Sequence, residues 1–127
     1  MNEKEVLNGF LDLFEKDKQE AYLKVWKAAK IDFNQFLKRP NQFRDPFGGN
    51  AIGIIYDRDT KPLGKKILAY ALKKAGTEHD LKASFFIEED GEDIDYPKVT
   101  RFIYECLIID LIQYIEYLQE SEENQQN

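Results

Sequence analysis

The sequence contains almost none of the residues that build disulfides and metal sites. Its 127 residues include one cysteine, Cys106, and one histidine, His79. A single cysteine excludes an intrachain disulfide, and a zinc site needs several cysteine or histidine ligands. The acidic stretch 88–95 fits no calcium-binding loop, because a loop with Gly91 at its sixth position would begin at Phe86. We therefore expect no metal and no cofactor.

The residues of nucleophilic catalysis are equally scarce. The only serines are Ser84 and Ser121, and neither lies in a nucleophile elbow. Cys106 falls on the apolar face of a predicted helix, where a thiol is usually inert. Gly64 and Lys65 lack the upstream glycine and the following hydroxyl of a phosphate-binding loop. Paired carboxylates are too common here to be informative, so we predict that the protein is not an enzyme and has no catalytic residues.

Long uncharged apolar runs are absent as well. The most apolar stretch, 99–118, is interrupted by four charged residues: Arg101, Glu105, Asp110 and Glu116. A membrane span needs about 20 mainly apolar residues. The segment MNEKEVLNGF also lacks the apolar centre of a signal peptide. With the single cysteine, these features predict a cytoplasmic protein that does not enter a membrane.

Helical periodicity dominates the apolar residues that are present. It runs through the first thirty residues and returns in a last helix, which Pro97 opens and which we expect to end near Gln119. That helix is apolar over most of its circumference, as is typical of a helix buried on several sides. We predict a mainly α fold: a compact helical domain, 1–119, around a buried C-terminal helix, followed by a polar, frayed tail, 120–127.

Two short segments leave an α+β fold open. Residues 51–56 form an apolar run that suits either a strand or a buried helical turn. Residues 83–96 suit either a β-hairpin around Asp90 and Gly91 or a helix that Gly91 ends. Alternating apolar residues at the start of this second segment favour the strand. A small β-hairpin is therefore part of the fold that we consider.

The core is predicted from the apolar positions of these segments. Its expected members are Leu7, Phe10, Phe14, Val25, Trp26, Phe36, Ile54, Ile67, Leu68, Phe85, Ile103, Leu107, Leu111 and Ile115. Asp110 falls inside the apolar arc of the last helix, and a buried carboxylate must be paired, hydrogen-bonded or protonated. We expect it to bond a buried tyrosine or a basic group in a structural network. Tyr104, Tyr114 and Tyr117 on the same helix offer surface for a homodimer or a partner.

The net charge of −6 hides two opposed blocks. Residues 1–15 carry −3, residues 16–74 carry +8 and residues 75–127 carry −11. Such asymmetry bears on partners rather than on fold. Either the basic and acidic blocks lie side by side and screen each other, or they face different partners.

The acidic block suggests a protein-binding function. Six carboxylates fall within eight residues: Glu88, Glu89, Asp90, Glu92, Asp93 and Asp95. Side chains so close repel one another unless a basic surface neutralises them, and such a patch steers basic partners toward it. We therefore predict an acidic inhibitor of the immunity-protein type, which masks a basic protein such as a nuclease toxin. The alternative is an ordinary solvated acidic turn.

The basic block supports a second hypothesis, an accessory protein that binds nucleic acid through segment 36–66. Its cations are Lys38, Arg39, Arg44, Arg58, Lys61, Lys65 and Lys66, and Phe36, Phe43 and Phe47 lie among them. Exposed rings could stack on bases while the cations, chiefly Lys38, Arg39, Arg44, Lys65 and Lys66, hold phosphates. The alternative is that these phenylalanines anchor the segment to the core.

Overall fold

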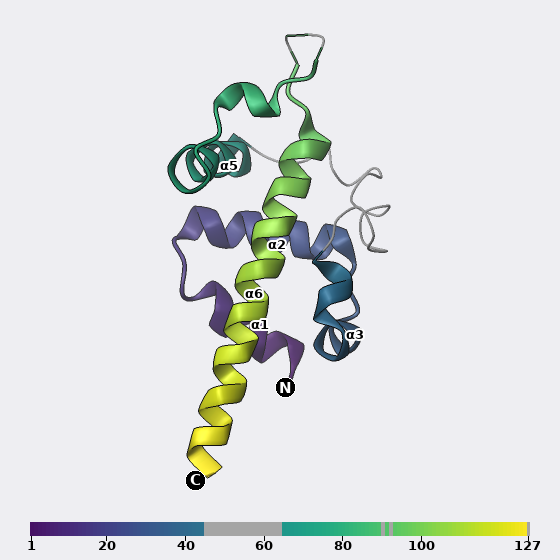
Figure 1. The fold of residues 1–127 in the computed structure, drawn as a ribbon, viewed down its shortest axis with the longest axis vertical. Helices are drawn as coiled ribbons and strands as arrows, with labels where there is room; N and C mark the ends of the chain where they lie inside the picture. Colours follow the sequence, from purple (N-terminus) through teal and green to yellow (C-terminus); the bar gives the residue numbers. More distant parts are fainter. Residues whose placement is uncertain (45–64, 90, 92, 127) are drawn as a thin grey trace.

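The protein is a mainly α domain in which short helices pack around one long C-terminal helix. The computed structural model describes residues 1–44, 65–89, 91 and 93–126. The elements are α1 (Glu3–Leu11), α2 (Lys16–Ala29), α3 (Phe33–Lys38), η1 (Pro40–Phe43), α5 (Lys65–Glu78), η3 (Ala83–Phe86) and α6 (Tyr96–Gln126), of which η1 and η3 are 3₁₀ helices (Figure 1). The described residues form no strand, so the predicted fold class is confirmed.

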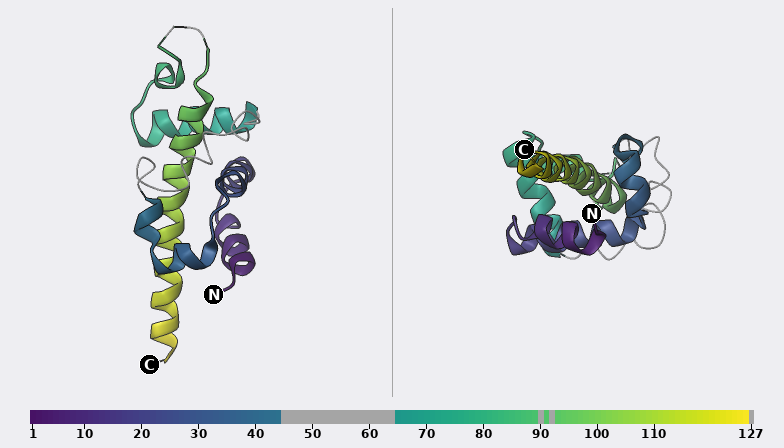
Figure 2. Two further views of the ribbon diagram at one scale, coloured as in Figure 1. Left: turned by 90° about the vertical axis from the view of Figure 1, so that its right-hand side faces the viewer. Right: turned by 90° about the horizontal axis from the view of Figure 1, so that it is seen from below.

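Helix α6 forms the centre of the core, as its apolar circumference predicts. It packs against α1, α2, α5 and η3, and in the view from below α1 and α2 lie across from it (Figure 2). Its buried residues are Val99, Phe102, Ile103, Tyr104, Cys106, Leu107, Ile108, Leu111, Ile112 and Ile115. At 31 residues, it is roughly 46 Å long at 1.5 Å per residue. The other helices therefore have one common surface to cover.

The expected end of this helix at Gln119 is wrong. Helix α6 continues to Gln126, beyond the other helices at the lower end of the molecule (Figure 1). The extra turns consist mainly of glutamate and glutamine, which are good helix formers when their side chains are exposed. The domain boundary at 119 and the fraying of the polar tail 120–127 stay predictions.

The N-terminal region folds as separate short helices with local signals at their ends. Asn2 caps α1 by accepting a 2.8 Å hydrogen bond from the backbone amide of Lys4. The charged residues after α1 divide it from α2, where the side-chain amide of Gln19 donates through Nε2 to the carbonyl oxygen of Phe14 at 2.7 Å. Asp32 caps α3 by accepting from two backbone amides, as its position before Phe33 predicts.

The preference for a strand at the start of 83–96 is wrong. Residues 83–86 form the 3₁₀ helix η3, because this turn places Phe86 in the core against Phe102, with ring centroids 5.4 Å apart. A single antiparallel bridge between Ile87 and Ile94 follows it. The chain thus reverses direction as a hairpin would, without forming paired strands. The other segment, 51–56, for which a strand or a buried helical turn was predicted, lies outside the described residues.

Most of the predicted core is confirmed. The fully buried members are Phe10, Val25, Trp26, Phe36, Ile67, Ile103, Leu107, Leu111 and Ile115. Four others, Leu7, Phe14, Leu68 and Phe85, are half-buried and pack against this cluster. Ile54 lies outside the described residues. The buried tyrosines Tyr22, Tyr70 and Tyr104 are missing from the predicted core, and Tyr22 is fully inaccessible.

Candidate functional site

The predicted acidic patch lies on the turn between η3 and α6, at the upper end of the molecule (Figure 1). Glu88, Glu89 and Asp93 are exposed there, and no ion pair joins them to another residue that the structure describes. Asp95 has a structural role instead: it accepts a 3.1 Å hydrogen bond from the amide of Lys98 in the first turn of α6. Asp90 and Glu92 lie outside the described residues.

Backbone hydrogen bonds fix the base of this acidic turn. The amide of Glu88 donates to the carbonyl oxygen of Asp93, and the amide of Asp95 donates to that of Phe86, both at 2.8 Å. Gly91 has a φ of 102°, a conformation that residues with a Cβ rarely adopt. The exposed carboxylates of Glu88 and Asp93 therefore stand at a base that backbone hydrogen bonds hold together.

In the described part of the basic, phenylalanine-containing segment, Phe36 and Phe43 are not available to stack on bases. Lys38, Arg39 and Arg44 are exposed on and after α3. Phe36 and Phe43, however, are buried, and their rings contact each other edge to face at 5.7 Å. They anchor the segment to the core, which is the alternative that the sequence left open. Lys65 and Lys66 begin α5, but the structure does not describe their side chains. Residues 47, 58 and 61 lie outside the described residues.

The aromatic surface expected on α6 is only partly available. Tyr104 is buried, which contradicts its place in an interface. Tyr114 is half-buried, and Tyr117 is 63% exposed. The predicted homodimer stays a prediction.

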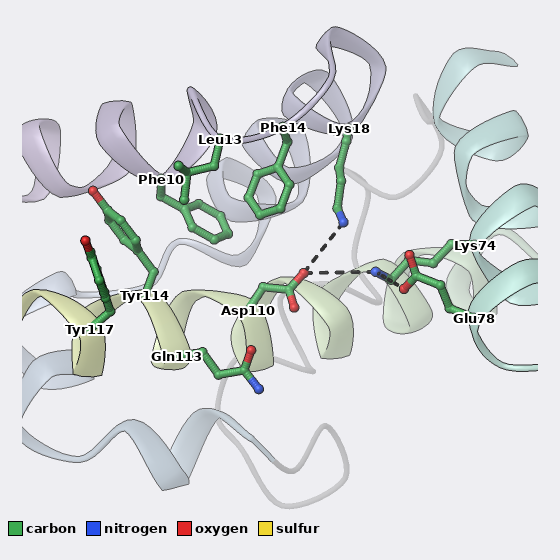
Figure 3. A pocket seen from close by; sticks show the side chains of 10 residues that line it. All are labelled: Phe10, Leu13, Phe14, Lys18, Lys74, Glu78, Asp110, Gln113, Tyr114 and Tyr117. Carbon is green, nitrogen blue, oxygen red and sulfur yellow. Dashed lines mark ion pairs between the residues drawn. The ribbon is translucent and has the colours of Figure 1, made fainter.

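A hollow lies where α1, α2, α5 and α6 meet, and sequence reasoning did not find it. This apolar cavity has a volume of about 520 Å³. Its lining residues are Phe10, Leu13, Phe14, Lys18, Lys74, Glu78, Asp110, Gln113, Tyr114 and Tyr117 (Figure 3). Apolar and aromatic side chains form one side of it, and four charged side chains gather at the other end. The size falls within the range of about 300–1000 Å³ that is usual for ligand pockets.

Asp110 is the centre of the charged end. Its carboxylate accepts a 2.5 Å hydrogen bond from the phenol of Tyr22, which in turn accepts one from Tyr70 at 3.2 Å. The ammonium groups of Lys18 and Lys74 lie 3.9 and 4.0 Å from the same carboxylate oxygen (Figure 3). The predicted network of a tyrosine and basic groups around Asp110 is confirmed. One carboxylate thus joins α2, α5 and α6.

The two lysines of this cluster have different surroundings. The Lys74 side chain is 5% exposed and forms a 2.7 Å ion pair with Glu78 one turn later. Lys18 has no such close partner: it lies 3.9 Å from Asp110, and the rings of Phe14, Tyr22 and Tyr70 lie 4.5, 5.4 and 5.7 Å from its nitrogen. Its side chain is 17% exposed, so it can be reached from the cavity. Lys18 is the less neutralised cation of the two.

Burial and neighbouring charges set the protonation of these groups. Burial lowers the pKa of Lys18, and the nearby Lys74 ammonium lowers it further. Burial also acts to lower the pKa of Lys74, but the hydrogen bond to Glu78 outweighs it and raises that pKa overall. Burial raises the pKa of Tyr70 to about 12 and, with the bond to Asp110, raises that of Tyr22 far above its usual range. The tyrosines therefore stay neutral donors.

The ion pairs of this cluster join the two charge blocks. Lys18 and Lys74 belong to the basic segment 16–74, whereas Glu78 and Asp110 belong to the acidic segment 75–127. The blocks thus pair with each other at the middle of α6, while the acidic turn stands apart from these pairs. Side-by-side screening accounts for part of the asymmetry and leaves Glu88, Glu89 and Asp93 outside it.

Cys106 and His79 come together on the side of α6 near η3. The thiol sulfur lies 3.9 Å from the ring nitrogen Nε2 of His79. Burial raises the pKa of this thiol to about 11, so it is neutral and a poor nucleophile near neutral pH. The pair is a packing contact, as predicted for Cys106, although His79 also contacts the Phe102 ring. Within the described residues, no group of three or more potential ligands could hold a metal ion.

Comparisons with known proteins supply no relative. No family model matches the chain, and no curated protein or solved structure gives a significant match. Among the described helices, none combines the length and the apolarity that crossing a membrane demands. Functional inference therefore rests on the geometry of the acidic turn and of the cavity.

Proposed function

We propose that the protein is a non-enzymatic binding protein that masks a basic protein partner, in the manner of an immunity protein that neutralises a nuclease toxin. The partner would bind the acidic turn formed by Glu88, Glu89, Asp90, Glu92, Asp93 and Asp95. The observation that carries the proposal is the exposure of Glu88, Glu89 and Asp93 on a turn whose base is held by backbone hydrogen bonds.

Electrostatics supports this use of the turn. Exposed like charges on a fixed turn repel one another, and a basic surface relieves that repulsion on binding. Because backbone hydrogen bonds already hold the base of the turn in the free protein, binding would cost less ordering entropy there. Two bases of segment 16–74, Lys18 and Lys74, lie beside Asp110 instead, and among the described residues no ion pair reaches Glu88, Glu89 or Asp93. A cytoplasmic location belongs to the same proposal, since the one cysteine is a buried free thiol.

The experiment compares two variants that lose the same charge. The first, Glu88→Gln with Glu89→Gln and Asp93→Asn, neutralises the turn and keeps Asp95 as the cap of α6. The matched control, Glu116→Gln with Glu120→Gln and Glu123→Gln, neutralises three exposed acids on α6. Proteins captured from lysate by the unmodified chain would be identified and their affinities measured at low and high salt.

We expect a basic partner whose affinity falls as the salt concentration rises. The turn variant should bind it at least about tenfold more weakly, and the control variant should bind it with unchanged affinity. Equal loss in both variants would mean that net charge alone attracts the partner, and would contradict the proposal. Retention by the turn variant would exclude the acidic turn as the binding surface. A gel-shift titration with oligonucleotides tests the nucleic-acid alternative separately; salt-sensitive binding that is lost in Lys38→Gln with Arg39→Gln would favour it.

A further inference from the structure

We propose that the cavity between α1, α2, α5 and α6 is a binding site for a small apolar aldehyde, held reversibly as an imine on the amine of Lys18. The site is the charged cluster around Asp110, which is separate from the acidic turn, and the inference does not depend on a protein partner. It rests on three features of the described residues: an apolar cavity of ligand size, an amine at its polar end, and charged groups that can take up and return protons.

The cavity walls select for an apolar body. Phe10, Leu13, Phe14, Tyr114 and Tyr117 line it, and they face the space in Figure 3. Leu13 and Tyr117 are 65% and 63% exposed, which is unusual for large apolar side chains. A ring or short alkyl chain that entered the cavity would cover them and remove this surface from water. Both residues stand at the open side, so the cavity is reached past them.

The amine of Lys18 is placed for reaction with a carbonyl group. A lysine becomes nucleophilic when it lies in an apolar site or next to another cation, and Lys18 has both surroundings. Three rings surround its nitrogen, and the Lys74 ammonium shares the carboxylate of Asp110 with it. Lys74 itself is committed to Glu78 at 2.7 Å. The reactive amine of the pair is therefore Lys18.

The titratable and charged groups that face Lys18 come from every helix packed against it. They are Tyr22 of its own helix, Tyr70, Lys74 and Glu78 of α5, and Asp110 of α6. Asp110, 3.9 Å away, can accept the proton that the ammonium must lose before attack. The Lys74 ammonium, 4.0 Å from the same carboxylate, is a cation beside this site that can stabilise the oxygen as it leaves.

The chemistry balances without an oxidant or a second substrate. The lone pair of Lys18 Nζ forms a bond to the carbonyl carbon and gives a carbinolamine. The carbinolamine oxygen takes up a proton and departs as water, leaving a protonated imine. Overall, the aldehyde and the lysine ammonium give an iminium ion and one water, with the charge of +1 unchanged. Hydrolysis by the reverse path releases the aldehyde, so the site binds rather than consumes it.

The test uses reductive trapping on the full chain. Benzaldehyde, an apolar aromatic aldehyde, is added with sodium cyanoborohydride near neutral pH, and peptide mapping follows the rate of benzylation at each lysine. Lys27, an exposed lysine on the same helix, is the internal reference. Glyceraldehyde, a polar aldehyde, is the matched probe. The variants are Lys18→Arg, which keeps the charge, Lys27→Arg as its control, and Leu13→Ala, which alters an exposed cavity wall; circular dichroism checks that each is folded.

We expect benzaldehyde to modify Lys18 about tenfold or more faster than Lys27, because burial of the ring adds to the reactivity of the amine. Leu13→Ala should reduce this preference, Lys18→Arg should abolish the fast phase, and Lys27→Arg should leave it unchanged. Equal rates at Lys18 and Lys27 would overturn the proposal. A preference for Lys18 that glyceraldehyde shares and Leu13→Ala does not reduce would also overturn it, because the cavity would then select nothing.

Discussion

The phenol of Tyr22 on α2 donates a 2.5 Å hydrogen bond to the carboxylate of Asp110 on α6, across 88 residues of sequence. Tyr22 is fully buried and Asp110 is half-buried. Hydrogen bonds to charged groups are the stronger ones in proteins, and a buried group left without its partner bears a desolvation cost. This bond therefore contributes both to stability and to the relative placement of the two helices.

Tyr22→Phe should lower the free energy of unfolding by about 1–3 kcal/mol, because it removes the donor and leaves the Asp110 carboxylate under-satisfied. Urea denaturation measures the change. Tyr117→Phe, at a residue that is 63% exposed, is the control and should change stability by less than about 0.5 kcal/mol. Equal changes in the free energy of unfolding for the two substitutions would show that the Tyr22–Asp110 hydrogen bond does not stabilise the fold.

Ile103→Ala should destabilise the protein by about 2–5 kcal/mol, because Ile103 is fully buried on the core-facing side of α6 and its truncation leaves a cavity. Ile109, two turns along on the same helix, is 41% exposed, and Ile109→Ala should cost at most about 1 kcal/mol. Chemical denaturation of both variants gives the comparison. An equal cost at the two positions would contradict the assignment of α6 as the central core helix with an exposed face at Ile109.

Stability should fall in alkaline solution. The pKa of Tyr70 is raised from 10.0 to about 12, and that of Tyr22 is raised as well, so the folded protein favours the neutral phenols. The unfolded chain loses these protons first, so the stabilisation is complete below about pH 10 and is lost as the pH rises toward about 12. Urea denaturation at a series of pH values measures the free energy of unfolding, and tyrosinate absorbance measures the ionisation of the tyrosines. A Tyr70→Phe chain should show a shallower fall, and stability independent of pH in this range would refute the prediction.

Alkylation of Cys106 should be slow in the folded protein. Burial raises its pKa from 9.0 to about 11, so near pH 8 the thiolate is about a hundredfold rarer than in an unfolded chain. Its low exposure, 7%, slows access further. Iodoacetamide labelling followed by mass spectrometry, in buffer and in urea, measures the ratio. Rapid labelling of the folded protein would mean that the helix opens at this point or that the thiol is activated by His79.

Removal of residues 120–127 should leave the core intact. The acids of this segment, Glu120, Glu122 and Glu123, are exposed, and α6 projects there beyond the other helices. We expect the free energy of unfolding to change by less than about 1 kcal/mol, while the helical circular dichroism signal per chain decreases. A larger loss of stability would move the end of the domain beyond Gln119.

The sequence was most informative where local periodicity decides structure. The all-round apolar character of α6 predicted its central position, and the place of Asp32 predicted the cap of α3. Asp110 was found because a carboxylate within an apolar arc requires a partner. At 83–86, by contrast, two adjacent phenylalanines gave no clear period, and tertiary packing of Phe86 decided the 3₁₀ conformation.

The cavity could not be predicted in the same way, because its walls come from four helices whose relative placement no local pattern encodes. One signal was available: Lys74 and Glu78 are four residues apart, which favours an ion pair on one helix face. Lys18 gave none, since a lysine in a charged segment resembles any solvated residue. The burial of Phe36 and Phe43 beside surface cations was likewise a matter of tertiary packing.

The central position of α6 also has a consequence for the order in which the protein can fold. Every helix that packs on α6 precedes it in the chain, and the contact between Tyr22 and Asp110 cannot form until α6 has left the ribosome. Until then α2 can pack against α5 through Tyr22 and Tyr70, but the surfaces of α1 and α2 that α6 covers stay exposed. The nascent chain therefore exposes part of its apolar surface during synthesis, and exposed apolar surface favours aggregation at that stage, whatever the stability of the complete fold.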